Sequence, residues 1–169
     1  MQSDEFILGE TNQLQSFDGR SENRQIVAEF CRQAQQQIRI FTPQLEGDIY
    51  DNADLIRSLS ALATRSPQTR IRVLVKDSAQ AVKSGHRLIE LSRRFTSSIH
   101  LHKTPVDTDN IDSAFIIVDN AAYLYKQVGS LFRGQFNFND KLKARELTKH
   151  FDEAWERSQP DLEMRRLFI

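Results

Sequence analysis

The sequence alternates between segments with a helical period and short apolar runs, and this alternation most constrains its fold. Apolar residues recur at helical spacing over four segments: 21–37, 52–65, 81–95 and 141–157. Short runs suited to strands lie between them, at 38–42, 71–75, 98–103, 114–118 and 121–127. Strands that alternate with helices need crossover connections, which produce parallel pairing. The pattern predicts an α/β fold, with a mixed, mostly parallel sheet flanked by helices on both faces.

Local signals predict several boundaries in the first half of the chain. Phe6-Ile7-Leu8 is expected to form a short first strand. Asp51 or Asn52 can cap the second helix, which Ser66-Pro67 ends. His86 lies within the third predicted helix, where we expect a solvated or partner-facing position.

The second half begins with a continuous apolar run at 114–118, typical of a central strand covered on both faces. Asp119-Asn120 then predicts a hairpin turn. Residues 128–140 contain two glycines and three phenylalanines and are predicted to form a loop. Pro160 suits the first turn of a short terminal helix that carries Leu162 and Leu167.

The composition limits the classes of partner. The 169 residues suit one domain over 1–169, and 23 basic residues balance 23 acidic ones, so no global field draws the chain to nucleic acid or to a membrane. The N-terminus lacks the pattern of a signal peptide, and the longest apolar run is too short to span a bilayer. We therefore expect a cytoplasmic protein. The single cysteine, Cys31, excludes an internal disulfide and lies on an apolar helical stripe, which predicts a buried thiol.

The order of these segments resembles one half of a phospholipase D-type domain over about residues 25–157. Four segments carry the resemblance: 38–43 with its Thr-Pro ending, 69–75, 114–120, and the Phe-x-x-x-Trp pattern at 151–155. The resemblance implies a catalytic signature of His-x-Lys, four further residues and Asp, then six further residues and Gly-Ser. In the family the His attacks a phosphodiester phosphorus, and the Lys neutralises charge on the phosphoryl oxygens.

This sequence departs from the signature. With Asp119 as the anchor, Asp112 stands at the His position and Ala114 at the Lys position. The Gly-Ser position falls on Lys126-Gln127, and Gly129-Ser130 is displaced by three residues. A carboxylate at 112 would repel a phosphate group, so the resemblance implies a site without the family's chemistry. His102 with Asp109 repeats the His-to-Asp spacing, but Thr104 and Pro105 then interrupt the pattern.

Other polar residues form a candidate pocket. Thr42, Lys76 and Asp77 follow predicted parallel strands, where α/β folds place ligand crevices, although Asp77 is equally suited to cap a helix. His100, His102 and Lys103 share another strand, and the two histidines point to one face. They lack an assignable third ligand, so no metal or other cofactor is predicted.

Two further features bear on partners. Phe132, Phe136 and Phe138 are expected either to fill the core or to cover a partner. Four basic residues recur along the last helix but alternate with acidic ones, which indicates a solvated face: Lys141, Lys143, Arg145 and Lys149. The composition therefore argues against nucleic acid as a partner.

Three functional hypotheses remain. The first is a non-catalytic binding, regulatory or assembly module, present as a homodimer or beside a larger partner enzyme. The second is a phosphodiesterase or nuclease-like enzyme rebuilt around His100, His102, Lys103 or Asp119. The third is a nucleic-acid-binding domain that uses the Phe-rich segment and the last helix. For the fold, Trp155→Ala is predicted to cost about 3–5 kcal/mol, as expected for a core aromatic residue.

Overall fold

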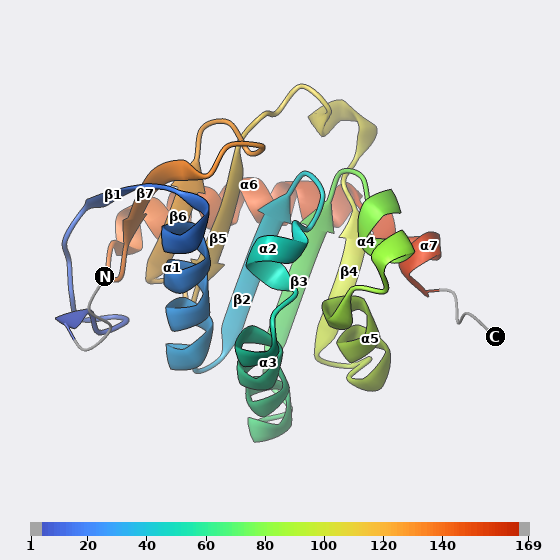
Figure 1. The fold of residues 1–169 in the computed structure, drawn as a ribbon, viewed down its shortest axis with the longest axis horizontal. Helices are drawn as coiled ribbons and strands as arrows, with labels where there is room; N and C mark the ends of the chain where they lie inside the picture. The colour runs from blue at the N-terminus through green and yellow to red at the C-terminus, as the bar shows by residue number, and fades with distance from the viewer. Residues whose placement is uncertain (1–4, 166–169) are drawn as a thin grey trace.

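The computed structural model describes residues 5–165, and these form one sheet with helices on both faces (Figure 1). Within this range the sheet has eight strands in the order β1-β7-β6-β5-β2-β3-β4-β8. The strands are β1 (Gln15–Asp18), β2 (Gln37–Thr42), β3 (Arg70–Val75), β4 (Ile99–Lys103), β5 (Ala114–Val118), β6 (Ala122–Lys126), β7 (Arg133–Asn137) and β8 (Gln159–Pro160). The predicted α/β class with a mixed sheet is confirmed.

Parallel pairing is confined to the centre of the sheet. Strands β2, β3 and β4 run parallel, whereas β5, β6, β7, β1 and β8 all join through antiparallel pairings. The prediction of a mostly parallel sheet was therefore wrong for the described residues. The reason is that helices connect strands that are neighbours in the sheet only from β2 to β4, whereas a hairpin connects β5 directly to β6.

The helices lie in two layers (Figure 1). On one face lie α1 (Arg20–Gln33), α2 (Gly47–Tyr50), α3 (Ala53–Arg65), α4 (Ala79–Ser84) and α5 (Arg87–Arg94), and the short α7 (Leu162–Arg165) lies near α4 and α5. The long α6 (Lys141–Arg157) crosses the other face, against β2, β5 and β6. A 3₁₀ turn, η2, covers Val106–Thr108. We call the two faces of the sheet the α1 face and the α6 face.

Each face has its own hydrophobic core, because side chains alternate along the strands. Ile40, Val73 and Ile116 point to the α1 face and pack in one cluster with α1, α3 and α5. Phe41 and Phe115 point to the α6 face, where their rings stack with centroids 5.2 Å apart. All five residues of β5 are buried, as predicted for a central strand.

Several local predictions are confirmed. Helix α6 begins and ends where the periodicity predicts, and the Asn52 side chain caps α3 by accepting a hydrogen bond of 3.0 Å from the Leu55 N–H. Asp119 and Asn120 have φ values of 52° and 55°, as a primed hairpin turn requires. Cys31 is buried, and burial raises the pKa of its thiol to about 12.

Three predictions near the N-terminus and the third helix were wrong. Residues 6–8 form no strand, and the chain instead reaches the sheet at β1, where only Phe17 is buried. The third predicted helix is two helices, because Gly85 adopts a left-handed conformation with φ of 68°. His86 is consequently not on a solvated helix face. It is buried and caps α5 by accepting from the Leu88 N–H.

The C-terminal half contains two further corrections. Residues 128–140 are not all loop, since β7 lies within them; Phe136 and Phe138 are buried in the core. Pro160 belongs to β8, and the carboxylate of Asp161 caps α7 instead. Leu167 lies outside the described residues. Within residues 5–165, no helix combines the length and apolar character needed to traverse a bilayer.

Candidate functional site

The carboxyl ends of β2 and β3 lie side by side at one end of the sheet, where β5 begins and β6 ends. We call this end of the strands the signature edge. Thr42 ends β2, and its backbone carbonyl accepts a hydrogen bond of 3.1 Å from the Lys76 N–H. The Thr42 hydroxyl donates to Glu46 Oε2 at 2.9 Å and accepts from the Leu45 N–H at 3.1 Å. Thr42 is 1% exposed, so it supports the turn into α2 and offers little surface to a ligand.

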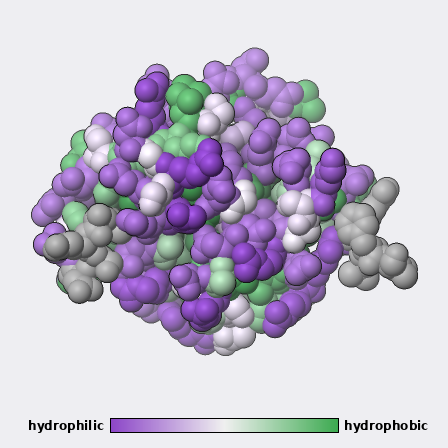
Figure 2. All heavy atoms as spheres, in the orientation of Figure 1, coloured by the Kyte–Doolittle hydropathy of each residue, from purple (hydrophilic) through white to green (hydrophobic). Residues whose placement is uncertain are grey.

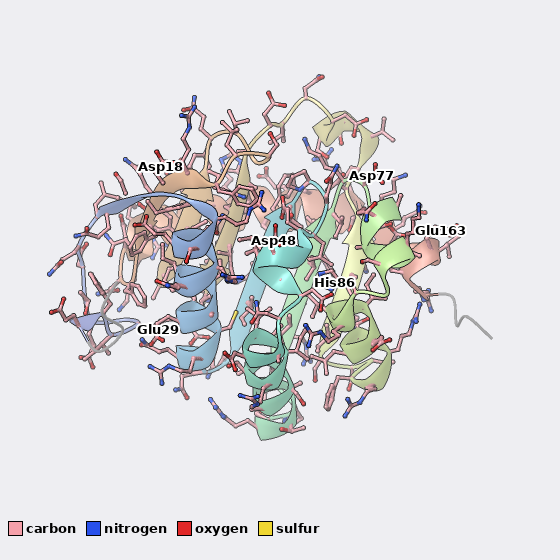
Figure 3. All side chains as sticks on the ribbon, viewed as in Figure 1. Asp18, Glu29, Asp48, Asp77, His86 and Glu163 are labelled. Atoms are coloured by element: carbon pink, nitrogen blue, oxygen red, sulfur yellow. The ribbon has the colours of Figure 1, made fainter. Side chains whose placement is uncertain are left out.

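Lys76 and Asp77 lie beside Thr42 but make structural contacts. The Lys76 ammonium donates to the backbone carbonyl of Ile111, which fastens the loop before β5. Asp77 accepts a hydrogen bond of 3.0 Å from the N–H of Ala79, the first residue of α4, although the N-cap position itself is Ser78. Figure 3 shows Asp77 above the end of β3. The structure thus brings Thr42, Lys76 and Asp77 together, and each already has a partner or role within the fold.

The two altered signature positions lie at the start of β5. Asp112 is exposed in the preceding loop, and Ala114 is the buried first residue of the strand. The Gly129 N–H donates to the Asp112 carbonyl at 2.6 Å, and a Cβ on Gly129 would lie 3.0 Å from the Ala114 Cβ. Gly129-Ser130 is therefore next to these positions in space, although it is displaced along the sequence.

Asp119 is a structural residue in this fold. Its carboxylate accepts three backbone N–H bonds, from Gln35 at 2.7 Å, Gln36 at 2.8 Å and Gln37 at 2.9 Å. These bonds join the β5–β6 turn to the chain that links α1 to β2. The carboxylate is thus fully engaged at the end of β5 opposite to Ala114.

Lys126 is the residue at the signature edge that the sequence reasoning missed. It ends β6 and pairs directly with Ala114, so both side chains project to the α1 face. Lys126 is only 5% exposed, and burial lowers the pKa of its ammonium, opposed by the charge of Glu46. A lysine side chain therefore occupies space beside the position where the family has its lysine, but it comes from the neighbouring strand.

The charge of Lys126 belongs to a mixed cluster around Phe132. The Lys126 ammonium lies 5.4 Å from the centre of the Phe132 ring, and the Arg20 guanidinium lies 4.6 Å from it. Arg20 pairs with Asp48 on α2 at 3.0 Å, and Glu46 lies at the start of the same helix. Figure 3 shows Asp48 on α2, in front of β2. Two cations thus face two carboxylates, which leaves this cluster without net charge.

The two histidines of the predicted pocket lie elsewhere. His102 and His100 project to the α6 face, away from Thr42. The His102 ring stacks on Trp155 with centroids 3.8 Å apart, and its Nδ1 is 2.8 Å from the Ser158 hydroxyl. Burial, followed by the charges of His100 and Arg72, lowers the pKa of His102 to about 4. Lys103 is exposed at the end of β4.

The structure does not bring together His102 and Asp109, the alternative pair considered from the sequence. His102 is held by Trp155 and Ser158, whereas Asp109 is exposed in the loop after η2. Among residues 5–165, no group of three or more His, Cys, Asp or Glu side chains is arranged to hold a metal ion. His100 and His102 instead line a cavity of about 430 Å³ together with Arg93 and Arg165.

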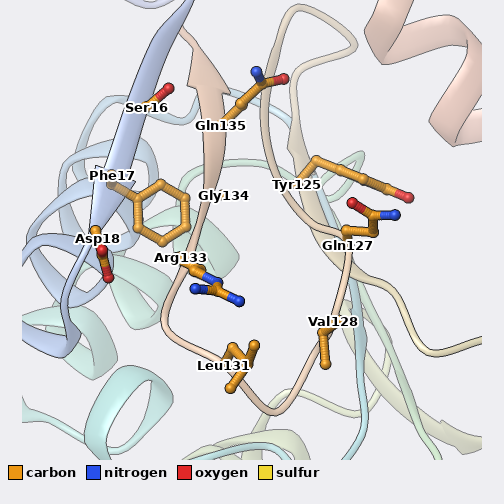
Figure 4. Close-up of a pocket in the computed structure, with 10 residues that line it drawn as sticks. All are labelled: Ser16, Phe17, Asp18, Tyr125, Gln127, Val128, Leu131, Arg133, Gly134 and Gln135. Atoms are coloured by element: carbon orange, nitrogen blue, oxygen red, sulfur yellow. The ribbon is translucent and has the colours of Figure 1, made fainter.

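Another cavity, of about 460 Å³, opens between β1, β6 and β7 (Figure 4). Asp18, Tyr125, Gln127 and Arg133 contribute polar groups to its wall. None of the six predicted pocket residues lines this cavity. It contains one carboxylate and one guanidinium, on paired residues of β1 and β7, and has no histidine.

Comparison of the sequence with models of known protein families gives one match. The sequence model described as "Domain of unknown function (DUF7931)" matches residues 19–167, so the chain belongs to that family. No curated protein matches the sequence.

Solved structures with the same fold include members of the phospholipase D family. Nuc from Salmonella typhimurium, described as a phospholipase D family member, superposes with a TM-score of 0.63 at 15% identity, covering 88% of this chain and 97% of Nuc. The phosphatidylserine synthase of Haemophilus influenzae Rd KW20 gives 0.66 at 11% identity, covering 100% of this chain and 41% of the synthase. TrmBL2, an archaeal chromatin protein with a novel mode of DNA binding, gives 0.65 at 15% identity, covering 90% of this chain and 55% of TrmBL2.

At these identities the likeness establishes the fold alone. The chain has a phospholipase D-like fold, as the order of its segments predicted. It spans about half of TrmBL2 and less than half of the synthase, but nearly all of Nuc. The proteins that share this fold include both enzymes and a DNA-binding protein, so the fold does not select among the three functional hypotheses.

Proposed function

We propose that this chain is a non-catalytic phospholipase D-like module that acts by binding and assembly. One observation carries the proposal: Asp112 and Ala114 stand where the family's chemistry needs an imidazole and an ammonium. The neighbouring Lys126 does not restore that chemistry, because its charge is balanced within the cluster of Arg20, Glu46 and Asp48. Phosphoryl transfer requires a nucleophile and net positive charge at the reacting group.

The histidines give no support to a rebuilt active site. A general base is most effective when its pKa is near the working pH. The pKa of His102 is lowered to about 4, and its ring is packed against Trp155 on the other face of the sheet. His100 and His102 are thus separated from the signature edge by the sheet itself.

A phosphodiesterase assay tests the proposal. The chain is incubated with bis(p-nitrophenyl) phosphate, with magnesium and separately with EDTA, beside an active phosphodiesterase as the positive control. We expect release of p-nitrophenol at the rate of buffer alone. Turnover above that rate that His102→Gln or Lys126→Met abolishes would refute the non-catalytic assignment.

The assembly part of the proposal rests on exposed apolar residues at the signature edge. Ile111 precedes β5, and Val128 and Leu131 follow β6; each is at least 38% exposed. Hydrogen bonding between Gly129 and Asp112 holds the two loops side by side, at the upper edge of the molecule in Figure 1. In the same orientation, Figure 2 shows hydrophobic residues among hydrophilic ones along this upper edge. Contiguous exposed apolar residues are typical of protein interfaces.

We propose that a second copy of the chain covers these two loops, so that the protein is a homodimer. The near-complete coverage of Nuc and the 41% coverage of the synthase support a unit that corresponds to one half of a larger arrangement. Two copies that meet about a twofold axis would each bury the same patch. The resemblance to the phospholipase D family supports the same arrangement, since its single-half members pair.

Multi-angle light scattering measures the assembly state. We expect the mass of a dimer for the parent chain and that of a monomer for Leu131→Glu. Leu142→Glu is the matched control, because Leu142 is 77% exposed on α6, away from the two loops. A monomeric parent chain, or a dimer that Leu131→Glu leaves intact, would contradict the proposal that a second copy covers the two loops.

A further inference from the structure

Basic side chains form a row on the α6 face of the sheet, away from the signature edge. The register aligns Arg39 on β2, Arg72 on β3 and His100 on β4 as direct neighbours. Arg70 lies two residues before Arg72 and therefore projects to the same face. The row crosses three adjacent strands, which are spaced about 4.8 Å apart in a sheet.

The hydrogen bonds of these residues leave positive charge uncompensated. Arg39 pairs with Asp152 at 3.2 Å and donates to the Asn120 amide oxygen at 2.8 Å. Among residues 5–165, Arg70 donates only to backbone carbonyls, at 2.8 Å each. Within the described part of the chain, the Arg72 guanidinium makes no hydrogen bond or ion pair; it lies 5.6 Å from the Trp155 ring. Three guanidinium groups thus share one carboxylate.

The pKa values of the row show the same excess of positive charge. Burial and then the charge of Arg39 lower the pKa of Arg72; the Asp152 carboxylate opposes this shift, and the charge of Arg70 adds to it. The pKa of His100 is lowered by burial and then by Arg72 and Arg70. Arginine has five donors and no means of losing its charge, so the Arg72 guanidinium is free to donate charge-assisted hydrogen bonds to an anion.

A small cavity lies among these side chains. Its volume is about 50 Å³, and Gln37, Ile38, Arg39, Arg70 and Arg72 line it. Since a water molecule takes about 30 Å³ in the liquid, this space suits a group of a few heavy atoms and excludes a nucleoside. Arginine forks bind the oxygens of phosphate in pairs, with charge-assisted hydrogen bonds.

We propose that this arginine cavity binds a single phosphate group, either inorganic phosphate or the terminal group of a phosphomonoester. Phosphate would accept hydrogen bonds from Arg72 and would neutralise the repulsion among the three arginines. A polynucleotide fits less well, because the cavity holds one phosphate and the chain as a whole has no net charge to attract a polyanion. The site lies on the opposite face from the signature positions and is independent of the function proposed for that edge.

Isothermal titration with inorganic phosphate, at an ionic strength held constant with sodium chloride, tests the proposal. We expect saturable binding by the parent chain and binding weakened about tenfold or more in Arg72→Gln. Arg145→Gln, which removes the same charge from an exposed position on α6, should bind as the parent does. Glycerol phosphate and dimethyl phosphate, titrated separately, distinguish a monoester site from one that takes only the free ion or also accepts a diester.

His100 provides a second readout that does not depend on the heat of binding. A bound anion favours the imidazolium form, so phosphate should raise the pKa of His100 as followed by NMR. The groups that face His100 are Arg70 and Arg72 on β3, His102 on its own strand, and Arg93 and Arg165, which line the same 430 Å³ cavity; a hydrogen bond to the Thr96 backbone raises the pKa of His100. Arg72→Lys, which keeps the charge but loses the planar fork, should bind with intermediate affinity and controls for folding.

Three outcomes would overturn the proposal. The first is the absence of saturable binding by the parent chain. The second is an equal loss of affinity in Arg145→Gln and Arg72→Gln, which would indicate general screening. The third is tight, steeply salt-dependent binding of a single-stranded oligonucleotide that inorganic phosphate does not displace, which would make the row a polynucleotide surface.

Discussion

Replacing Asp119 by glycine should destabilise the domain by about 2–4 kcal/mol, because three backbone N–H groups lose a charged acceptor. A hydrogen bond to a charged group contributes about 1.5–3 kcal/mol when water cannot replace it. Gln35 and Gln36 are exposed, so water can take over those two bonds in part, whereas Gln37 is half-buried at the start of β2. We therefore count the full free energy of the hydrogen bond from Gln37 and only part of that of the bonds from Gln35 and Gln36.

Two further substitutions separate the hydrogen bonds from the turn conformation. Asp119 has φ of 52°, which glycine adopts freely and alanine does not, so Asp119→Ala should cost about 1–2 kcal/mol more than Asp119→Gly. Asp119→Asn keeps one acceptor oxygen and tolerates the same φ, so it should retain about half of the stability that Asp119→Gly loses.

Urea unfolding followed by circular dichroism measures these differences, with a lower midpoint and an unchanged slope as the expected result. The reasoning is refuted if Asp119→Gly stays within about 0.5 kcal/mol of the parent chain, the range of ordinary surface substitutions. The same variants should leave phosphodiesterase activity at background, because the carboxylate is a structural group here.

Three other perturbations give distinct results. The folded pKa of His102 is about 4 against an ordinary value of 6.5, so the unfolded chain binds more protons between these pH values. Stability should therefore fall as the pH drops from 6.5 to 4, and thermal melts of His102→Gln should show a flatter dependence. Trp155→Ala should cost about 2–3 kcal/mol in urea unfolding, below the value for a fully buried ring, because Trp155 is half-buried; a loss under about 0.5 kcal/mol would contradict its packing role. In Gly134→Ala the new Cβ would collide with the Tyr125 carbonyl, so this variant should lose about 2–3 kcal/mol of stability in the same melts. In the control Gly47→Ala the new Cβ would lie 3.9 Å from the Asp51 Cβ, an ordinary contact, so no comparable loss is expected.

Sequence signals that act over a few residues predicted their elements well. The helical period over 141–157 reproduced α6. The cap of α3 was narrowed to Asp51 or Asn52, because capping joins residues three apart, and the structure has Asn52 in this role. Asp119-Asn120 predicted the hairpin turn because few residues tolerate two successive positive φ values. The substitution of the signature residues is also a property of the sequence, given the resemblance to the phospholipase D family.

Strand pairing was decided by the tertiary structure. The hairpin turn alone would pair Val118 with Ala121, but the structure pairs Val118 with Ala122. That shift by one residue places Lys126 beside Ala114, where Tyr125 would otherwise lie, because each step along a strand reverses the face. No local pattern fixes this choice, and Lys126 was therefore missed as a residue of the signature edge.

The arginine row likewise depends on strand pairing that the sequence alone does not predict. The sequence determined the helical segments such as 141–157, the positions where the signature residues are missing, and the balance of acidic and basic residues over the chain. Only the tertiary structure brought Arg39, Arg72 and His100 onto one face as neighbours, from strands separated by whole helices. Local periodicity fixes which face of its own strand each residue takes, but the order and register of the strands depend on contacts between distant segments.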